Sequence, residues 1–288
     1  MAPTMPALRP GQLIEESPEL GSPPIVYQRL MQVINHPRGA AGDVANVISQ
    51  DTALTARLLK LVNSAFFAFP KKIDTVSQAV TVVGTSQVRD LALATSVVDM
   101  FQSIPGDLID AEEFWKHSLA CGVAARAIAA LRNEANVERF FVAGILHDVG
   151  RLVLLLRAPD HMRAALERAK EKEILTYEAE REVLGFDHGR VGGSLMDHWS
   201  MSDALRESIR LHHEPNRAER CPVETATVHF GDILANALQI GSSGERFVPP
   251  VSPGAWNGLG FGPEKMGLVV EEVDKQYAAA VQLLGMGE

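Results

Sequence analysis

The sequence contains little cysteine: Cys121 and Cys221 stand far apart among 288 residues and form no CxxC motif. So few cysteines exclude a disulfide scaffold and suit a reducing compartment. Long hydrophobic runs are also missing, since an apolar stretch such as residues 152–156 is far shorter than the roughly 20 residues that cross a bilayer. Residues 1–10 lack the apolar core of a signal peptide. We therefore expect a cytoplasmic protein that does not enter the membrane.

An excess of basic residues is missing as well. Lys and Arg number 27 against 36 Asp and Glu, and the formal net charge is −9. This acidic balance provides no general attraction to nucleic acid or to anionic lipid, so we expect neither as a partner. The content of 46% hydrophobic and 22% charged residues is ordinary for a soluble globular protein.

Helical periodicity runs through most of the chain, and no segment alternates convincingly as a strand. Leu54, Leu58 and Leu59 recur at helical spacing, and Asp51 stands where it can cap their helix. In the same way Asp187 can cap a helix that begins at His188. We predict an all-α fold.

Composition divides the predicted helices into two packed subdomains. Residues 24–105 form the first and residues 110–288 the second, separated by a segment that contains Pro105 and Gly106. Residues 1–23 are rich in Pro, Gly and Glu, and we predict an irregular arm there. Residues 241–263 are rich in Gly and Pro and are predicted as a long loop.

Seven His and Asp residues form an ordered series along the second subdomain. They recur at intervals of one or two predicted helices: His117, His147, Asp148, His188, His212, His213 and Asp232. Imidazole together with carboxylate is a ligand set of zinc, iron and manganese sites. If the helices converge, the chain contains a buried metal centre.

His117 lies within a predicted helix over residues 111–131, one turn after Glu113. The carboxylate and the imidazole therefore share one helical face and could reach one site. Taken alone, this pair is better explained as polar surface residues at a helix start.

His147 and Asp148 follow an apolar helix and precede Gly150. Neighbouring residues on a helix point about 100° apart, so both can bind one ion only near a helix end or bend, which Gly150 allows. Burial of the pair without a partner or a metal would be costly. Alternatively, Asp148 caps the next helix and His147 is a hydrogen-bonded core histidine. We favour the ligand interpretation.

The remaining candidates also have alternatives. His188 is followed by glycines whose spacing often reflects simple packing, and an adjacent pair such as His212 and His213 at a helix C-terminus is favoured by the helix dipole. Asp232 lies inside an apolar helix and needs a cation, but His229 one turn earlier is a competitor for the site. Three further histidines lack such company and are expected on the surface: His36, His161 and His198.

The order of His117, His147-Asp148 and Asp232 resembles the H…HD…D pattern of the HD superfamily of metal-dependent phosphohydrolases. His188 and the pair His212-His213 are similar to the additional ligands of its HD-GYP branch, which hydrolyses cyclic di-GMP at a two- or three-metal site. Glu113 falls where some of those enzymes carry a carboxylate. The resemblance implies one or two divalent or transition metal ions, either Fe, Mn, Zn or Ni.

Longer segments resemble the HDOD family more narrowly. Residues 48–67 are similar to its signature, as are the segments Phe114-Trp115-Lys116-His117-Ser118 and Gly144-Ile145-Leu146-His147-Asp148-Val149-Gly150-Arg151. The resemblance implies an all-helical two-part module of bacterial signalling, with an HD-like second half and no general enzymatic activity established. Such a module acts through a signalling protein partner or a nucleotide or phosphate ligand.

The chain departs from the HD-GYP enzymes in two places. Pro215-Asn216-Arg217 follows His213-Glu214 where those enzymes carry the run that names them, and Arg151 replaces the usual lysine. Arginine still binds phosphate but does not exchange its proton at neutral pH. We therefore predict a regulatory or output module with a metal site. The alternative is a metal-dependent phosphohydrolase of a nucleotide or phosphodiester, with Asp148 and Arg151 in catalytic roles.

Overall fold

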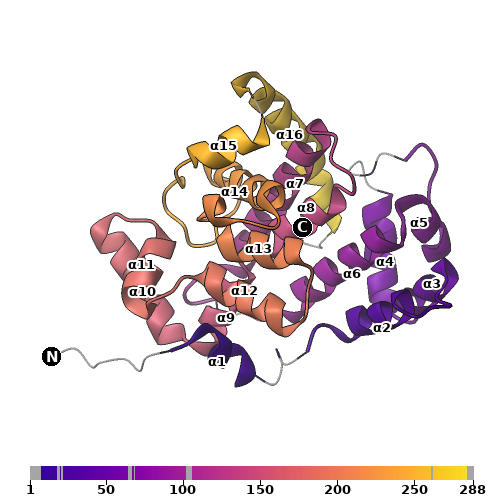
Figure 1. Cartoon of the computed structure of the whole chain (residues 1–288), viewed down its shortest axis with the longest axis horizontal. Coiled ribbons are helices and arrows are strands. Elements are labelled where there is room, and N and C mark those ends of the chain that lie inside the picture. Colours follow the sequence, from indigo (N-terminus) through magenta and orange to yellow (C-terminus); the bar gives the residue numbers. More distant parts are fainter. Residues whose placement is uncertain are drawn as a thin grey trace.

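The structure, a computed structural model, describes residues 8–17, 20, 22–63, 67, 69–101, 106–260 and 262–283. Within these ranges the chain forms helices and no strand, which confirms the predicted all-α class. The helices form two packed subdomains, one of α2 to α6 and the other of α7 to α16, and the indigo α1 lies against the second (Figure 1). Residues 64–66 of the HDOD-like segment and residues 103–105 of the predicted linker lie outside the described residues.

The first subdomain consists of α2 (Ile25–Ile34), α3 (Ala41–Ser49), α4 (Thr52–Val62), α5 (Val76–Val83) and α6 (Thr85–Met100). Asp51 caps α4 as predicted, because its Oδ1 accepts from the backbone N–H of Leu54 at 2.9 Å. Gly84 separates α5 from α6 with a φ of 101°, a conformation that favours glycine.

The second subdomain surrounds the long helix α7 (Ala111–Leu131), which packs against α8, α14 and α16. Its other α-helices are α8 (Glu138–Leu146), α9 (Val149–Arg157), α10 (Pro159–Lys172), α11 (Thr176–Leu184), α12 (His188–His198), α13 (Asp203–Leu211), α14 (Pro222–Ala237), α15 (Pro253–Leu259) and α16 (Met266–Leu283). Two 3-10 helices, η2 (Pro215–Arg217) and η3 (Pro263–Lys265), complete it. Contacts of α6 with α8 and of α4 with α16 join the two subdomains.

Two segments that we expected to be irregular contain helices. The predicted arm includes α1 (Pro10–Glu15), which packs on α9 and α12 and buries Leu13 and Ile14. The predicted loop includes α15, which Ser252 caps. Both helices are too short for a clear hydrophobic period, and tertiary burial or a cap stabilises each of them.

Two glycines allow the helices around the candidate ligands to approach closely. A Cβ atom at Gly150 of α9 would lie 2.0 Å from the backbone oxygen of His188 on α12. A Cβ atom at Gly144 of α8 would lie 2.6 Å from the Cα atom of Gly122 on α7. Neither position has room for a side chain. Glycine at these two positions therefore lets α9 approach α12 and α8 approach α7 closely.

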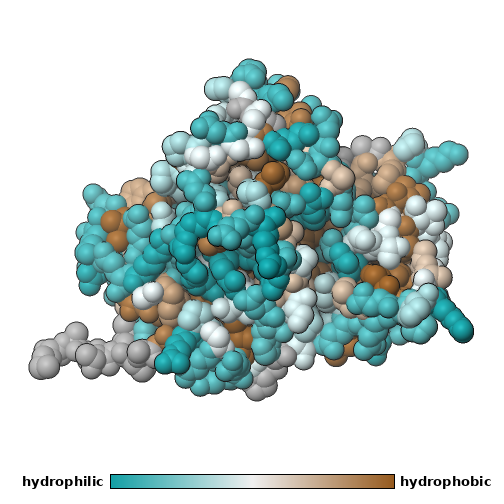
Figure 2. Space-filling model, in the orientation of Figure 1, coloured by the Kyte–Doolittle hydropathy of each residue, from teal (hydrophilic) through white to brown (hydrophobic). Residues whose placement is uncertain are grey.

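Hydrophilic side chains cover the face of the molecule over α12 and α13 (Figure 2). This face includes the exposed ion pairs of Asp197 with Arg206 and Arg210. None of the described helices is long and apolar enough to cross a membrane.

Candidate metal centre

The turn between α8 and α9 is the middle of the candidate centre. His147 ends α8 with helical backbone angles, and Asp148 begins α9 with φ of −95° and ψ of 9°. The side chain of Asp148 makes no capping hydrogen bond, so the alternative of a simple helix cap is wrong. Both side chains turn to one side of the bend, where His147 Nε2 lies 3.5 Å from Asp148 Oδ2.

A first group of donors gathers on the α7 side of this turn. The ligand atoms of His117, His147 and Asp148 all lie within 4.8 Å of one another. Asp232 of α14 adds a carboxylate, because its Oδ1 lies 3.2 Å from His117 Nε2 and 3.7 Å from His147 Nε2. Helices from three parts of the second subdomain therefore meet at this group.

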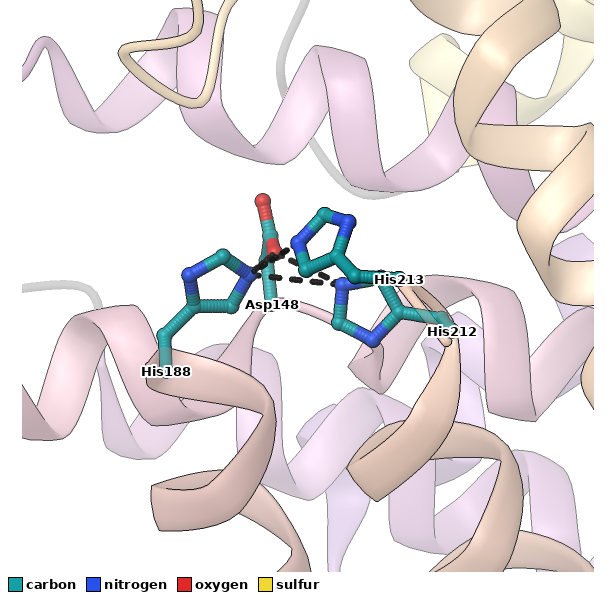
Figure 3. Close-up of side chains that lie close together, drawn as sticks. All are labelled: Asp148, His188, His212 and His213. Atoms are coloured by element: carbon teal, nitrogen blue, oxygen red, sulfur yellow. Dashed lines mark hydrogen bonds and ion pairs between the residues drawn. The ribbon is translucent and has the colours of Figure 1, made fainter. Parts of the chain in front are cut away.

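A second group also includes Asp148. Asp148, His188, His212 and His213 have ligand atoms within 4.8 Å of one another, and Figure 3 shows their side chains pointing toward a common centre. His188 Nε2 lies 2.8 Å from Asp148 Oδ1 and 3.3 Å from His212 Nε2. His213 Nε2 lies 2.9 Å from His188 Nε2. Asp148 belongs to both groups and therefore links them.

Not every candidate joins the groups. Glu113 faces solvent at the start of α7, with its side chain 45% exposed, and accepts a hydrogen bond from Lys116 at 2.9 Å. It therefore belongs to the surface, and its prediction as a ligand is not supported. His36 and His198 are exposed as expected, whereas His161 is buried because α10 packs against α9 and α11.

The donor atoms lack ordinary partners. Both ring nitrogens of His117, Nε2 of His147 and Oδ1 of Asp148 are buried and make no hydrogen bond of acceptable geometry. Buried polar atoms without partners are costly, and His117, His147 and Asp148 each bring one ligand atom to the same region, so this region calls for a cation. Ligands bound at about 2.1 Å around one tetrahedral ion lie about 3.4 Å apart. The separations in the second group run from 2.8 to 3.7 Å and span this value, so small shifts of the side chains would let them bind one ion.

Glu180 of α11 supports the second group and was not predicted. It is fully buried, and its Oε2 lies 2.7 Å from His188 Nδ1 while accepting from the His188 backbone N–H at 2.8 Å. A carboxylate on Nδ1 turns Nε2 toward the site and fixes the tautomer that binds metal. Helix α11 also carries Glu178 and Glu182, and nothing in the sequence distinguishes Glu180 from them.

Arg151 is a buried cation beside the shared carboxylate. Its guanidinium donates to the backbone oxygen of Ser243 at 2.6 Å and to Ser243 Oγ at 2.8 Å, and lies 3.6 Å from Asp148 Oδ2. Burial opposes the charge on Asp148, but Arg151 and the neighbouring imidazoles outweigh it and hold the pKa of Asp148 well below its usual value. Asp148 is therefore available as a carboxylate ligand at neutral pH.

The histidines of the centre differ in protonation. Burial and Arg151 oppose a charge on His188, but Glu180 and Asp148 outweigh them and raise its pKa to about 9. Burial, together with the charges of His147 and His188, lowers the pKa of His212 to about 3. In the metal-free protein the raised pKa of His188 contributes stability below about pH 6.5, which is lost as the pH rises through about 9.

We expect metal loading near pH 7 to release protons. His188 must become neutral before Nε2 can bind an ion, whereas His212 is already neutral. The apparent affinity should therefore fall as the pH is lowered from 9 toward 6.5. Calorimetric titration with Zn²⁺ in two buffers of different ionisation enthalpy measures the release. Identical heats in the two buffers would contradict the protonation states given above.

A family model described as the HDOD domain matches residues 20–215. The chain belongs to the HDOD family. An uncharacterized protein of Treponema pallidum (strain Nichols) is 28% identical to this HDOD chain over 227 residues, which make up 78% of this chain and 43% of that protein. The chain thus spans less than half the length of that relative.

Solved structures share the fold of this HDOD chain. An HDOD domain protein of unknown function from Geobacter sulfurreducens is 27% identical, with a TM-score of 0.74 over 90% of this chain and 92% of the other. A protein from Shewanella amazonensis, named as a candidate phosphohydrolase, is 24% identical, with a TM-score of 0.71 over 96% of each chain. Both are all-α relatives. The 24% identity to the Shewanella protein is too low to show more than a shared fold.

Proposed function

We propose that this HDOD chain is a bacterial signal-transduction module that acts by binding a signalling protein partner. Its second subdomain, residues 110–288, holds one or two divalent or transition metal ions in this proposal. The convergence of two donor groups on Asp148 supports the metal site, and the match to the HDOD family supports the signalling role. Fe, Mn, Zn and Ni are the ions for which imidazole and carboxylate ligands are suited.

Each donor group would bind one ion. The first ion would be bound by His117, His147, Asp148 and Asp232, and the second by the group that contains His188, His212 and His213. A bound ion supplies positive charge where Asp148 and Asp232 are buried. The ligands reside on α7, α12, α14, the α8–α9 turn and the end of α13, so a loaded centre would link these parts of the second subdomain.

The depth of the ligands favours regulation over catalysis. His117, His147, His188 and His212 are fully buried, and Asp148 is only 2% exposed. Arg151, the group that would stabilise a phosphoryl oxygen, is 1% exposed and already donates to Ser243. A substrate phosphate would have to displace the hydrogen bonds that Arg151 donates to Ser243.

One observation favours the alternative, a metal-dependent phosphohydrolase. A cavity of about 370 Å³ reaches His213 and is lined by Tyr177, Arg217, His229 and prolines of residues 249–253. A bound ion lowers the pKa of its water and polarises a phosphoryl oxygen. In that case Asp148 would bridge the ions, and His213 would be the ligand nearest to an entering nucleotide or phosphodiester.

Metal content and turnover together test the proposal. We expect the protein purified without a His-tag to contain Fe, Mn, Zn or Ni, and removal of the ion by a chelator to lower the melting temperature. At an ion concentration of 100 times Kd, binding adds about 2.7 kcal/mol, which corresponds to a shift of several degrees in a chain of this size. A metal-free protein with an unchanged melting temperature after Mn²⁺ or Zn²⁺ addition would refute the metal centre.

A panel of nucleotides and phosphodiesters, run with Mn²⁺ on the fully loaded protein, separates the two functions. The regulatory proposal expects no turnover from a loaded centre. Turnover that disappears in the variant His147→Ala with Asp148→Ala would establish the phosphohydrolase instead. The same double variant should contain no metal in either case, because it removes a ligand from each group.

A further inference from the structure

His229 of α14 uses both of its ring nitrogens within the protein. It is 4% exposed, and its Nδ1–H donates to the backbone oxygen of His212 at 2.7 Å. Its Nε2 accepts from the backbone N–H of Ser252 at 3.1 Å. These contacts leave no nitrogen to bind an ion, so His229 is no competitor of Asp232 for the metal although it lies only one turn away on the same helix.

The backbone oxygen that accepts from His229 belongs to the peptide group between two candidate ligands. It is the carbonyl of His212, and this peptide joins His212 to His213, two ligands of the second group. The orientation of one peptide plane therefore affects the direction of both imidazoles. His212 is also fixed from its ring, because its Nδ1–H donates to the backbone oxygen of Ile209 at 2.9 Å and leaves Nε2 directed at His188.

The other contact of His229 reaches the wall of the cavity at His213. Ser252 begins α15, and its Oγ donates to Asn216 Oδ1 at 3.0 Å. Ser252 and Asn216 both line the cavity of about 370 Å³, as does His213. His229 thus joins one ligand pair on one side to the cavity wall on the other.

We propose that His229 is a positioning residue for the second ion. It holds the His212–His213 peptide in the orientation that turns both imidazoles toward Asp148 and His188. Within the described part of the chain the ring nitrogens of His229 bond to His212 and Ser252 and not to His117 or His147, so its effect falls on the second group and not on the first. This inference rests on the proposed metal centre.

Three variants of the full chain test the inference by Zn²⁺ or Co²⁺ titration, with ion stoichiometry measured by calorimetry. In His229→Ala we expect the second ion to bind about 10- to 100-fold more weakly, the usual cost of losing an outer-shell partner of a metal site, and the first ion to bind as before. In His229→Asn the amide nitrogen takes the place of Nδ1 and can still donate to His212, so most of the affinity should return. His161→Ala removes a buried histidine of α10 outside both groups and should leave both ions unaffected.

The outcomes separate this inference from the proposed function. Two ions bound with unchanged affinity in His229→Ala would overturn the inference alone. Equal weakening of both ions in His229→Ala would also overturn it, because general loosening of the fold would then explain the loss. A wild-type chain that binds no ion would overturn the metal centre and this inference with it. The absorption spectrum of bound Co²⁺ gives a second readout, since the band of the second site alone should change in His229→Ala and recover in His229→Asn.

Discussion

Asp148→Asn is expected to abolish binding of both ions while the chain remains folded. Asp148 is the residue common to both donor groups, and its two carboxylate oxygens meet different histidines: Oδ2 is 3.5 Å from His147 Nε2, and Oδ1 is 2.8 Å from His188 Nε2. Asparagine keeps the shape but removes the charge, and its amide nitrogen cannot bind a cation. One substitution therefore removes a charged ligand from both sites at once, and we expect neither ion to bind.

Metal analysis of the untagged variant and Zn²⁺ titration measure this loss, and circular dichroism checks the helical content. Asp197→Asn is the matched control. It makes the same change on α12, where Asp197 is exposed and pairs with Arg206 and Arg210. The control should bind as much metal as the wild type. Wild-type metal content in Asp148→Asn would show that the chain binds its ions elsewhere.

Local sequence signals predicted the parts of the centre that depend on one helix end. Asp187 caps α12 as expected, with its Oδ1 accepting from Arg190 N–H at 3.0 Å, and this places His188 in the first turn. The bend between His147 and Asp148 follows from two helices that meet without a loop. A helix cap or bend requires only neighbouring residues, so the sequence alone contains the information.

Depth and long-range pairing were not predictable in the same way. Helical spacing places Glu113 on the same face of α7 as His117. It does not show that this end of α7 is exposed to solvent one turn before the site. Glu180 and Ser243 reach the centre only through tertiary contacts, since α11 packs on α10 and the segment after α14 passes Arg151 of α9. Those contacts arise from tertiary structure, and no period or motif in a single sequence encodes them.

The same argument explains why the role of His229 was left open. Its spacing from Asp232 made it a competitor for the site, although Asp232 was the predicted ligand. The distinction comes from Ser252 and the His212 carbonyl, which engage both nitrogens of His229. Asp232 meets instead His117 and His147, two imidazoles with unpaired nitrogens. The surroundings of each side chain, and not its position along α14, decide which one can bind metal.

Arg151→Met is expected to destabilise the metal-free protein by about 3–5 kcal/mol, the usual cost of removing one partner from a buried ionic cluster. Arg151 is 1% exposed and lies 3.6 Å from Asp148 and 3.7 Å from Glu180. Methionine fills much of the volume but leaves both carboxylates buried without the guanidinium. Urea unfolding of the chelator-treated protein measures the change.

Metal should reverse part of this loss. In the metal-free protein the guanidinium of Arg151 balances the charge of Asp148. An ion bound at Asp148 would be a second positive charge in the same buried space, so Arg151 opposes its binding. We therefore expect a smaller difference in unfolding free energy between Arg151→Met and wild type at saturating Zn²⁺, and tighter Zn²⁺ binding by the variant. Arg217→Met, at a half-exposed arginine paired with Glu214, is the control and should change neither quantity by more than about 0.5 kcal/mol. A loss in Arg151→Met that is equally large with and without Zn²⁺ would mean that the buried arginine and the metal do not share the charge of Asp148.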